Sequence, residues 1–139
     1  MHSTHLLDAP LTIMYAPPLL RSLTRPEGLL GHVLLRSYRV DERPSWLAAA
    51  GLPPLMLTGR VFDASLAIGR AVMAWAGVGL VPPTMFQGEL ASQRLAIPFS
   101  TEVSVGGYWL TQLQMRPDTS GMAAFRLWLL DKLTGASAP

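Results

Sequence analysis

The chain has 139 residues, of which 50% are hydrophobic and 14% are charged, and it contains no cysteine. A chain of this length can bury a full hydrophobic core as one compact domain, and the absence of cysteine excludes disulfide frameworks, thiolate zinc sites and cysteine nucleophiles. The formal net charge of +2 argues against a polybasic nucleic-acid binder, and high aliphatic content with low net charge excludes disorder.

Apolar runs of strand length alternate with segments of helical period along the chain. In chain order we expect a strand over 11–16, a short helical piece over 19–23, a strand over 33–37, a helix over 41–50, a strand over 57–63, a helix over 65–76, a strand over 78–81, a helix over 83–91, a strand over 103–113 and a helix over about 119–134. This alternation predicts an α/β fold with a mostly parallel sheet.

Specific residues mark the ends and irregular points of these elements. Asp41 is a favourable N-cap, and Gly51 suits the C-terminal end of the same helix. Within the last strand, Gly106 and Gly107 indicate a bulge or the close approach of another segment. The final helix has one apolar face, made of Met122, Phe125, Leu129 and Leu133.

Neither end of the chain indicates a targeting or membrane segment. Residues 1–12 lack a basic stretch followed by an apolar one, so we expect no secretory signal. The longest run without charge, 71–88, contains glycines and prolines that interrupt any helix of the roughly 20 residues needed to span a bilayer. We therefore expect a soluble, cytoplasmic protein without membrane contact.

Catalytic and metal-binding patterns are missing from the sequence. It has no nucleophile elbow, Gly-rich phosphate loop or zinc-protease motif, and its carboxylates show no spacing suited to acid–base chemistry. His2 and His5 are spaced to share a helical face, but they lie in a terminus that we expect to be mobile. We therefore expect no enzymatic activity, no metal and no cofactor.

Arginines gather in one stretch, at Arg21, Arg25, Arg36, Arg39 and Arg43. Acidic residues are interleaved with them, so we interpret the stretch as a solvated, ion-paired face rather than a phosphate-binding surface.

Polar groups stand at the ends of elements in two places. In the first, Asp63, Ala64 and Ser65 join a strand to a helix, where free N–H groups and the Ser65 hydroxyl suit an anion or carboxylate. The alternative is an ordinary N-cap by Asp63 or Ser65. In the second, Gly107 lets the backbone approach another group and Tyr108 presents a phenol; the alternative there is a simple bulge with a half-buried tyrosine.

Several segments together resemble the effector-binding domain of LysR-type transcriptional regulators. The segment GVGLVPPTMFQGELASQRLAIPF (77–99) resembles that domain's signature, and residues 108–133 resemble its final hinge strand and C-terminal helix. LLRSYRVDERPSWLAAAG (34–51), RVFDAS (60–65) and VSVGGYWLT (103–111) are most similar to the AmpR-type regulators of β-lactamase genes.

The resemblance implies a fold like that of type II periplasmic binding proteins, with two lobes and a ligand cleft between them. It implies that 1–139 is a single partial domain, with lobe II complete over about 16–104 and lobe I only partial. The strands that cross between the lobes are then expected at about 11–16 and 108–113. Because the final helix then lacks its usual partner, its apolar face is expected to be exposed or used for association.

The resemblance also implies a small-molecule effector. In the AmpR-type branch this is a muropeptide, or a related carboxylate-bearing ligand, and a serine and a tyrosine line the cleft. These roles fall on Ser65 and Tyr108, with Asp63, Ala64 and Gly107 beside them. The family turn usually has a serine where this chain has Ala64, which removes one hydroxyl.

Two functions remain open at this point. The first is a ligand-sensing module of a LysR-type regulator that forms homo-oligomers and contacts DNA only through a helix-turn-helix region absent from this chain. The second is an association module that pairs with full-length LysR-type regulators without binding effector. A solute-binding protein fragment and an enzyme are further, disfavoured alternatives.

Overall fold

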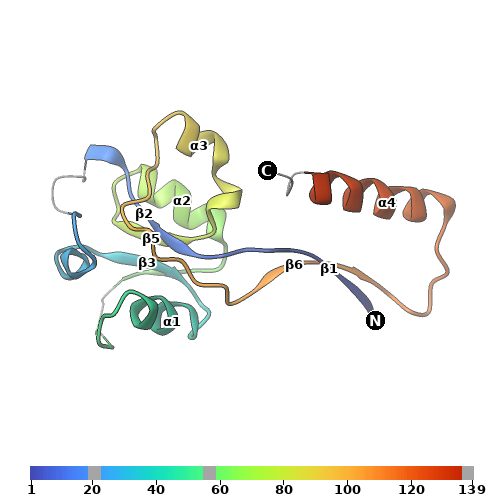
Figure 1. The fold of residues 1–139 in the computed structure, drawn as a ribbon, viewed down its shortest axis with the longest axis horizontal. Coiled ribbons are helices and arrows are strands. Elements are labelled where there is room, and N and C mark those ends of the chain that lie inside the picture. Colours follow the sequence, from blue (N-terminus) through green and yellow to red (C-terminus); the bar gives the residue numbers. More distant parts are fainter. Residues whose placement is uncertain (19–22, 55–58, 136–139) are drawn as a thin grey trace. The chain divides into compact units, whose positions relative to one another are not determined.

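The computed structural model describes residues 1–18, 23–54 and 59–135 (Figure 1). The chain divides into two compact units. The larger unit is Ala9–Val105, and the smaller unit combines Met1–Asp8 with the chain from Gly106 onward.

A four-stranded sheet lies at the centre of the larger unit. Its strands, β2 (Thr12–Met14), β5 (Val78–Val81), β3 (Leu34–Ser37) and β4 (Val61–Phe62), stand in the order β2-β5-β3-β4. Strand β3 pairs in parallel with both β5 and β4, and β2 pairs antiparallel with β5. The expected mostly parallel sheet is therefore confirmed.

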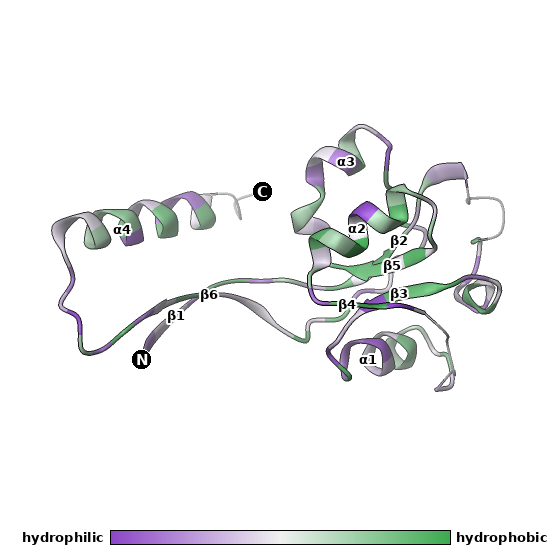
Figure 2. Cartoon of the chain, turned by 180° about the vertical axis from the view of Figure 1, so that it is seen from behind, coloured by the Kyte–Doolittle hydropathy of each residue, from purple (hydrophilic) through white to green (hydrophobic). Residues whose placement is uncertain are grey.

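Helices cover both faces of this sheet. Helix α1 (Glu42–Ala49) lies on one face, and α2 (Ser65–Met73) and α3 (Gln87–Ala91) lie on the other (Figure 1). Short 3-10 helices, η2 (Pro26–Gly31) and η3 (Pro83–Met85), occupy two of the connections. The central strands are strongly hydrophobic, as Figure 2 shows.

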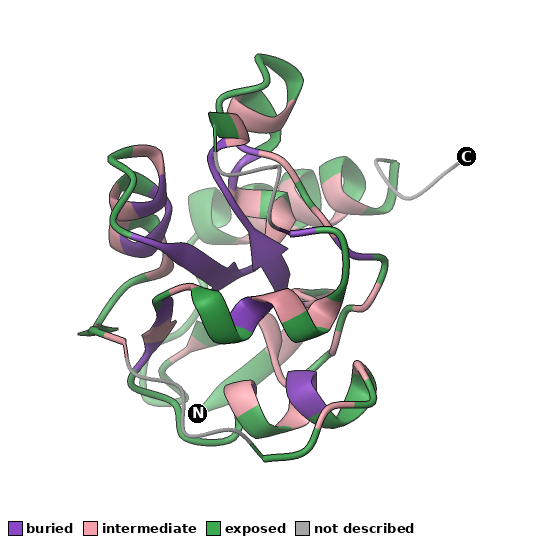
Figure 3. Cartoon of the chain, turned by 90° about the vertical axis from the view of Figure 1, so that its left-hand side faces the viewer, coloured by how far each residue is buried: buried purple, intermediate pink, exposed green. Residues whose placement is uncertain are grey.

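Alternating side chains divide the core into two layers. On β3, Leu34 belongs to the layer that contains Trp46 of α1, whereas Leu35 belongs to the layer that contains Ile68 of α2. These four side chains, Leu34, Leu35, Trp46 and Ile68, are each at most 1% exposed. This alternation is what a sheet between two helical layers requires, and Figure 3 shows the buried strands between more exposed helices.

The smaller unit is a two-stranded antiparallel ribbon with one helix. Strand β1 (His2–Asp8) pairs with β6 (Gly107–Gln112), and α4 (Ser120–Gly135) follows. The Thr119 hydroxyl accepts a hydrogen bond from the Met122 N–H over 3.2 Å, which caps α4 where the sequence predicts the helix to begin. No described residue of α4 is buried.

The N-terminal region forms strands in both units. Residues 2–8 form a strand rather than a mobile terminus. Residues 11–16 do form extended chain, but they lie in the larger unit, where all six are buried and β2 pairs with β5. The strand that pairs with β6 is β1, and the crossing of residues 11–16 between two lobes stays a prediction. The continuous apolar run at 11–16 predicts a buried strand, whereas β1 is about half polar and shows little hydrophobic periodicity.

Smaller differences concern element lengths. The expected helix over 83–91 is η3 followed by α3, and the expected strand over 103–113 is regular only in β6. The expected helical piece over 19–23 and the start of the strand over 57–63 fall largely outside the described residues. None of the described helices is both long and apolar enough to cross a membrane.

Candidate functional site

Helix α2 begins without a side-chain cap. It starts at Ser65, shortly after β4 ends at Phe62, and its N-cap residue is Ala64 with φ −143° and ψ 137°. A methyl group cannot accept a hydrogen bond, and neither Asp63 nor Ser65 replaces it. The expectation of an ordinary N-cap by Asp63 or Ser65 is therefore wrong.

Two backbone donors at this helix end have no acceptor within the described parts of the chain. The N–H groups of Ala67 and Ile68 both donate to the Ala64 carbonyl, over 3.1 and 3.3 Å. The preceding N–H groups, of Ser65 and Leu66, find no such partner. Unpaired N–H groups and the helix dipole together favour a negatively charged group at this position.

The side chains around this helix end are accessible. Asp63 and Ala64 are exposed and Ser65 is half-buried. The Asp63 carboxylate makes no hydrogen bond or ion pair with any described residue, so it does not occupy the helix terminus. The strand-to-helix turn thus has two N–H donors and one hydroxyl that lack a partner in the described chain.

The second predicted position lies in the ribbon of the smaller unit. Tyr108 is half-buried and opposes Leu7 of β1, and Gly107 opposes Asp8. A Cβ atom on Gly107 would lie 2.7 Å from the Leu7 carbonyl oxygen, so the predicted close approach of another segment is confirmed. The irregularity of the ladder lies in β1, between His5 and Leu7, and not at the glycines of β6.

The predicted site residues therefore form two groups, one in each unit. Asp63, Ala64 and Ser65 lie together at the start of α2, and Gly107 and Tyr108 lie together at the start of β6. Neither hydroxyl, that of Ser65 or that of Tyr108, has a hydrogen-bond partner in the described chain.

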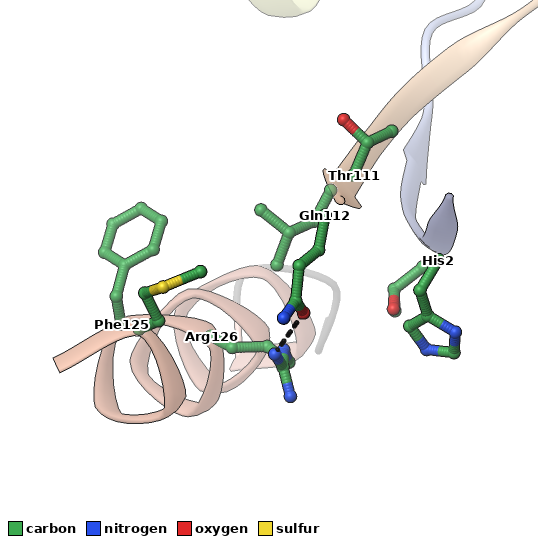
Figure 4. Close-up of a pocket in the computed structure, with 8 residues that line it drawn as sticks. His2, Thr111, Gln112, Phe125 and Arg126 are labelled. Atoms are coloured by element: carbon green, nitrogen blue, oxygen red, sulfur yellow. Dashed lines mark hydrogen bonds between the residues drawn. The ribbon is translucent and has the colours of Figure 1, made fainter. Parts of the chain in front are cut away.

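Sequence reasoning missed a small cavity in the smaller unit. It has a volume of about 90 Å³ and lies between the ribbon and α4, and Figure 4 shows His2, Thr111, Gln112, Phe125 and Arg126 around it. An Arg126 nitrogen donates to Gln112 Oε1 over 2.8 Å, and Arg126 also forms an ion pair with Asp118. No local pattern predicts this cavity, because it brings together three separate segments.

The arginine-rich stretch contains an ion pair as well as bonds to backbone carbonyls. Arg39 Nε lies 3.8 Å from Glu42 Oε1, and the Ser37 hydroxyl donates to Glu42 Oε2 over 2.6 Å. Desolvation, followed by the nearby charge of Arg36, lowers the pKa of the Arg43 guanidinium. Arg21 lies outside the described residues. In the described chain no group of three or more acidic, histidine or cysteine side chains is arranged to hold a metal ion.

Comparison with known proteins decides the family. A model of the LysR substrate binding domain matches residues 1–134. The chain belongs to this family. The resemblance seen in the sequence is thereby confirmed, together with the α/β fold of the periplasmic-binding-protein type that LysR effector-binding domains share.

Curated proteins similar to this chain include transcriptional activators. The chain is 52% identical over 128 residues to the HTH-type transcriptional activator AmpR of Pseudomonas aeruginosa, covering 91% of this chain and 43% of that protein. It is 45% identical over 133 residues to AmpR of Rhodobacter capsulatus, covering 96% of this chain and 45% of that protein. The chain thus spans less than half the length of these relatives.

Solved structures give the same result. The effector domain of AmpR from Pseudomonas aeruginosa superposes with a TM-score of 0.94 at 48% identity, covering 98% of this chain and 66% of that one. The effector-binding domain of AmpR from Citrobacter freundii gives 0.91 at 35% identity, covering 96% and 68%.

A variant of the Citrobacter freundii domain also superposes, with a TM-score of 0.90 at 34% identity, covering 95% of this chain and 68% of that one. It carries a threonine-to-valine, a serine-to-alanine and a tyrosine-to-phenylalanine substitution. The substituted serine and tyrosine lie as many positions apart in that protein as Ser65 and Tyr108 do in this chain.

Proposed function

We propose that this chain is the ligand-sensing, effector-binding part of a LysR-type transcriptional regulator of the AmpR type, and that its effector is a muropeptide or a related carboxylate-bearing fragment of peptidoglycan. The observation that carries the proposal is the uncapped start of α2, where the N–H groups of Ser65 and Leu66 and the Ser65 hydroxyl have no partner in the described chain. Family membership supplies the context.

The chemistry of this helix end suits a carboxylate. Two N–H groups at the positive end of a helix accommodate one carboxylate, and a hydrogen bond to a charged group contributes about 1.5–3 kcal/mol. The Ser65 hydroxyl donates a further bond to the same ligand. Among the described residues no acidic side chain already fills the position, because the Asp63 carboxylate accepts no hydrogen bond from the N–H groups at the start of α2.

Tyr108 is proposed as the second contact. Its hydroxyl has no partner in the described chain, and a phenol both donates and accepts hydrogen bonds. The matching separation of the serine and tyrosine substituted in the Citrobacter freundii variant supports a joint role for Ser65 and Tyr108. Gly107 leaves room for the ribbon strands to approach beside Tyr108.

In the regulator proposed here, effector binding shifts the population between two conformations and so changes how the promoter is engaged. DNA is contacted through a helix-turn-helix region outside this chain, and the regulated genes serve β-lactamase production or cell-wall recycling. Such a protein acts in the cytoplasm, as a homo-oligomer.

Thermal unfolding with and without a 1,6-anhydro-muropeptide tests the proposal. A ligand that binds only the native state adds about 2.7 kcal/mol of stability at a hundredfold excess over its Kd. We expect a saturable rise in Tm that Ser65→Ala and Tyr108→Phe each abolish or strongly reduce. Tyr38→Phe, on a tyrosine that is 66% exposed, is the matched control and retains the rise. A rise that survives both site substitutions contradicts the proposed site, and its absence from the wild-type chain contradicts the proposed sensing function.

A second candidate function follows from α4. Met122, Phe125 and Trp128, spaced three residues apart on this helix, are 38%, 53% and 53% exposed, respectively, and adjoining apolar side chains of this size favour an association surface. In this alternative the chain pairs with full-length LysR-type regulators without binding effector. Gel filtration with a full-length AmpR separates the two: co-elution without any muropeptide-induced Tm rise supports association, and independent elution contradicts it.

A further inference from the structure

The β1–β6 ribbon changes register beside Tyr108. From His2 to His5 each residue of β1 opposes one residue of β6, and His5 opposes Trp109. After His5, the residue that opposes Tyr108 is Leu7 rather than Leu6. Leu6 is therefore the extra residue of a β-bulge next to the Tyr108 pair. Bulges increase the local twist and redirect neighbouring side chains, and they are frequent beside functional sites.

His5 contacts groups on both sides of this bulge. Its ring packs edge-on against Trp109, with centroids 4.8 Å apart and an interplanar angle of 73°. Its Nε2 lies 3.1 Å from Asp8 Oδ1, and since a carboxylate only accepts, Nε2 donates. The bond joins the residue before the bulge to a residue after it. We call His5, Asp8 and Trp109 the bulge clamp.

Gly107 completes the fit of the clamp. A Cβ atom at this position would lie 3.0 Å from His5 Nε2, in addition to its approach to the Leu7 carbonyl. Because side chains alternate along a strand, Gly107 and Trp109 face the same side of β6 and Tyr108 faces the other. The clamp therefore acts on Tyr108 through the backbone of the ribbon and not by contact with the phenol.

Register is the property that these contacts control. If the pairing seen from His2 to His5 continued without a bulge, Leu6 would oppose Tyr108, and Asp8 would oppose Gly106 instead of Gly107. The individual contacts are weak, since the His5 and Asp8 side chains are 42% and 71% exposed. They act together between His5 and Leu7, where loss of the bulge would shift the pairing of β1 with β6 by one residue.

We propose that His5, held by Asp8 and Trp109, is a positioning residue for Tyr108: it keeps the bulge at Leu6 and so fixes the direction of the Tyr108 phenol for ligand binding. The last part of this statement rests on the proposed function, whereas the control of the bulge does not. The two parts are therefore tested separately.

The first test uses the chain without ligand. The sequence contains three tyrosines, Tyr15, Tyr38 and Tyr108, so ¹⁹F NMR of the 3-fluorotyrosine-labelled chain gives three signals, and Tyr108→Phe identifies one of them. We expect His5→Ala to shift or broaden the Tyr108 signal alone. His2→Ala, on the same strand, is the control and leaves it in place. An unchanged Tyr108 signal in His5→Ala overturns the proposal, and so does an equal change in all three signals.

The second test measures affinity for the 1,6-anhydro-muropeptide in a double-mutant cycle. Because His5 acts through Tyr108, we expect His5→Ala to weaken binding about tenfold, close to the loss for Tyr108→Phe, and to add nothing in the Tyr108→Phe background. His5→Gln, which keeps a donor for Asp8, loses less. Additive losses overturn the positioning role. If the wild-type chain does not bind the muropeptide, the proposed function fails, and the ¹⁹F experiment still decides whether the clamp holds Tyr108.

Discussion

Replacing Ala64 by a capping residue measures how much free energy of unfolding the chain forgoes because α2 lacks an N-cap side chain. The Ala64 backbone, with φ −143° and ψ 137°, already has the extended conformation of an N-cap, so a longer side chain needs no backbone change. Asparagine at this position would accept a hydrogen bond from the Leu66 or Ala67 N–H. We expect Ala64→Asn to stabilise the chain by about 1 kcal/mol and to raise Tm by roughly 4 °C.

Ala64→Asp separates capping from charge. It caps as well as asparagine does and adds about 0.3–1 kcal/mol from the interaction of its charge with the helix dipole. A like charge about 4 Å from a bound carboxylate repels it by up to ~4 kcal/mol near a protein surface. We therefore expect Ala64→Asp to weaken muropeptide binding at least about tenfold, and Ala64→Asn to weaken it less.

Thermal unfolding and isothermal titration calorimetry on the three chains provide the assay. If neither substitution raises Tm, the Leu66 N–H is already satisfied and the reasoning is refuted. If both stabilise the chain but the aspartate leaves muropeptide affinity unchanged, the ligand carboxylate does not bind at this helix end.

Three further predictions concern the larger unit and are checked by chemical or thermal unfolding. Gly69→Ala in α2 destabilises the chain by about 1–3 kcal/mol, because its Cβ would lie 2.1 Å from the Phe86 ring. Gly88→Ala in α3 meets nothing within 4 Å and stabilises the chain by about 0.5–1 kcal/mol. Equal effects of the two substitutions would contradict the packing described. Trp46→Ala removes a side chain that is 1% exposed and a hydrogen bond from its Nε1 to the Thr101 carbonyl, and should cost about 3–5 kcal/mol, with a loss below about 1 kcal/mol showing that the α1 layer is not a packed core. Burial raises the pKa of the Tyr15 hydroxyl above its ordinary value, so the unfolded chain releases this proton at a lower pH than the folded chain does. The free energy of unfolding therefore falls as the pH rises beyond about 10. Tyr15→Phe should flatten that fall, and an unchanged alkaline profile would refute the prediction.

The elements with strong local signals could be predicted from the sequence. Residues 78–81 read as a buried strand and form β5 with all four residues buried. Thr119 and the apolar period after it predicted α4, whose start Thr119 caps. Gly51, with φ +74°, ends α1 as expected, because glycine adopts this backbone conformation without strain.

The ribbon could not be predicted, because its stability comes from pairing between distant segments. Strand β1 contains His2, Thr4 and Asp8 among a few leucines, so its period is weak, and its partner β6 lies about a hundred positions away. The bulge at Leu6 depends on both strands at once. The strand over 11–16 was recognised, but local pattern could not assign it to the sheet of the larger unit.

The candidate site, like the fold, could be predicted from the sequence only in part. The sequence identified Ser65 and Tyr108 as residues at the ends of elements, and family resemblance gave them a role. It could not tell that Ala64, rather than Asp63 or Ser65, occupies the N-cap position, because the choice depends on where β4 ends and the chain turns. The missing cap is the feature that leaves the Leu66 N–H open, beside that of Ser65.

The most direct test of this account is a titration of the ¹⁵N-labelled chain with the 1,6-anhydro-muropeptide, followed by NMR at the amides of Ser65 and Leu66. The account predicts large, saturable shifts of these two amides, together with a shift at Tyr108, and their loss in Ser65→Ala. Saturable binding that leaves the Ser65 and Leu66 amides unmoved would contradict it.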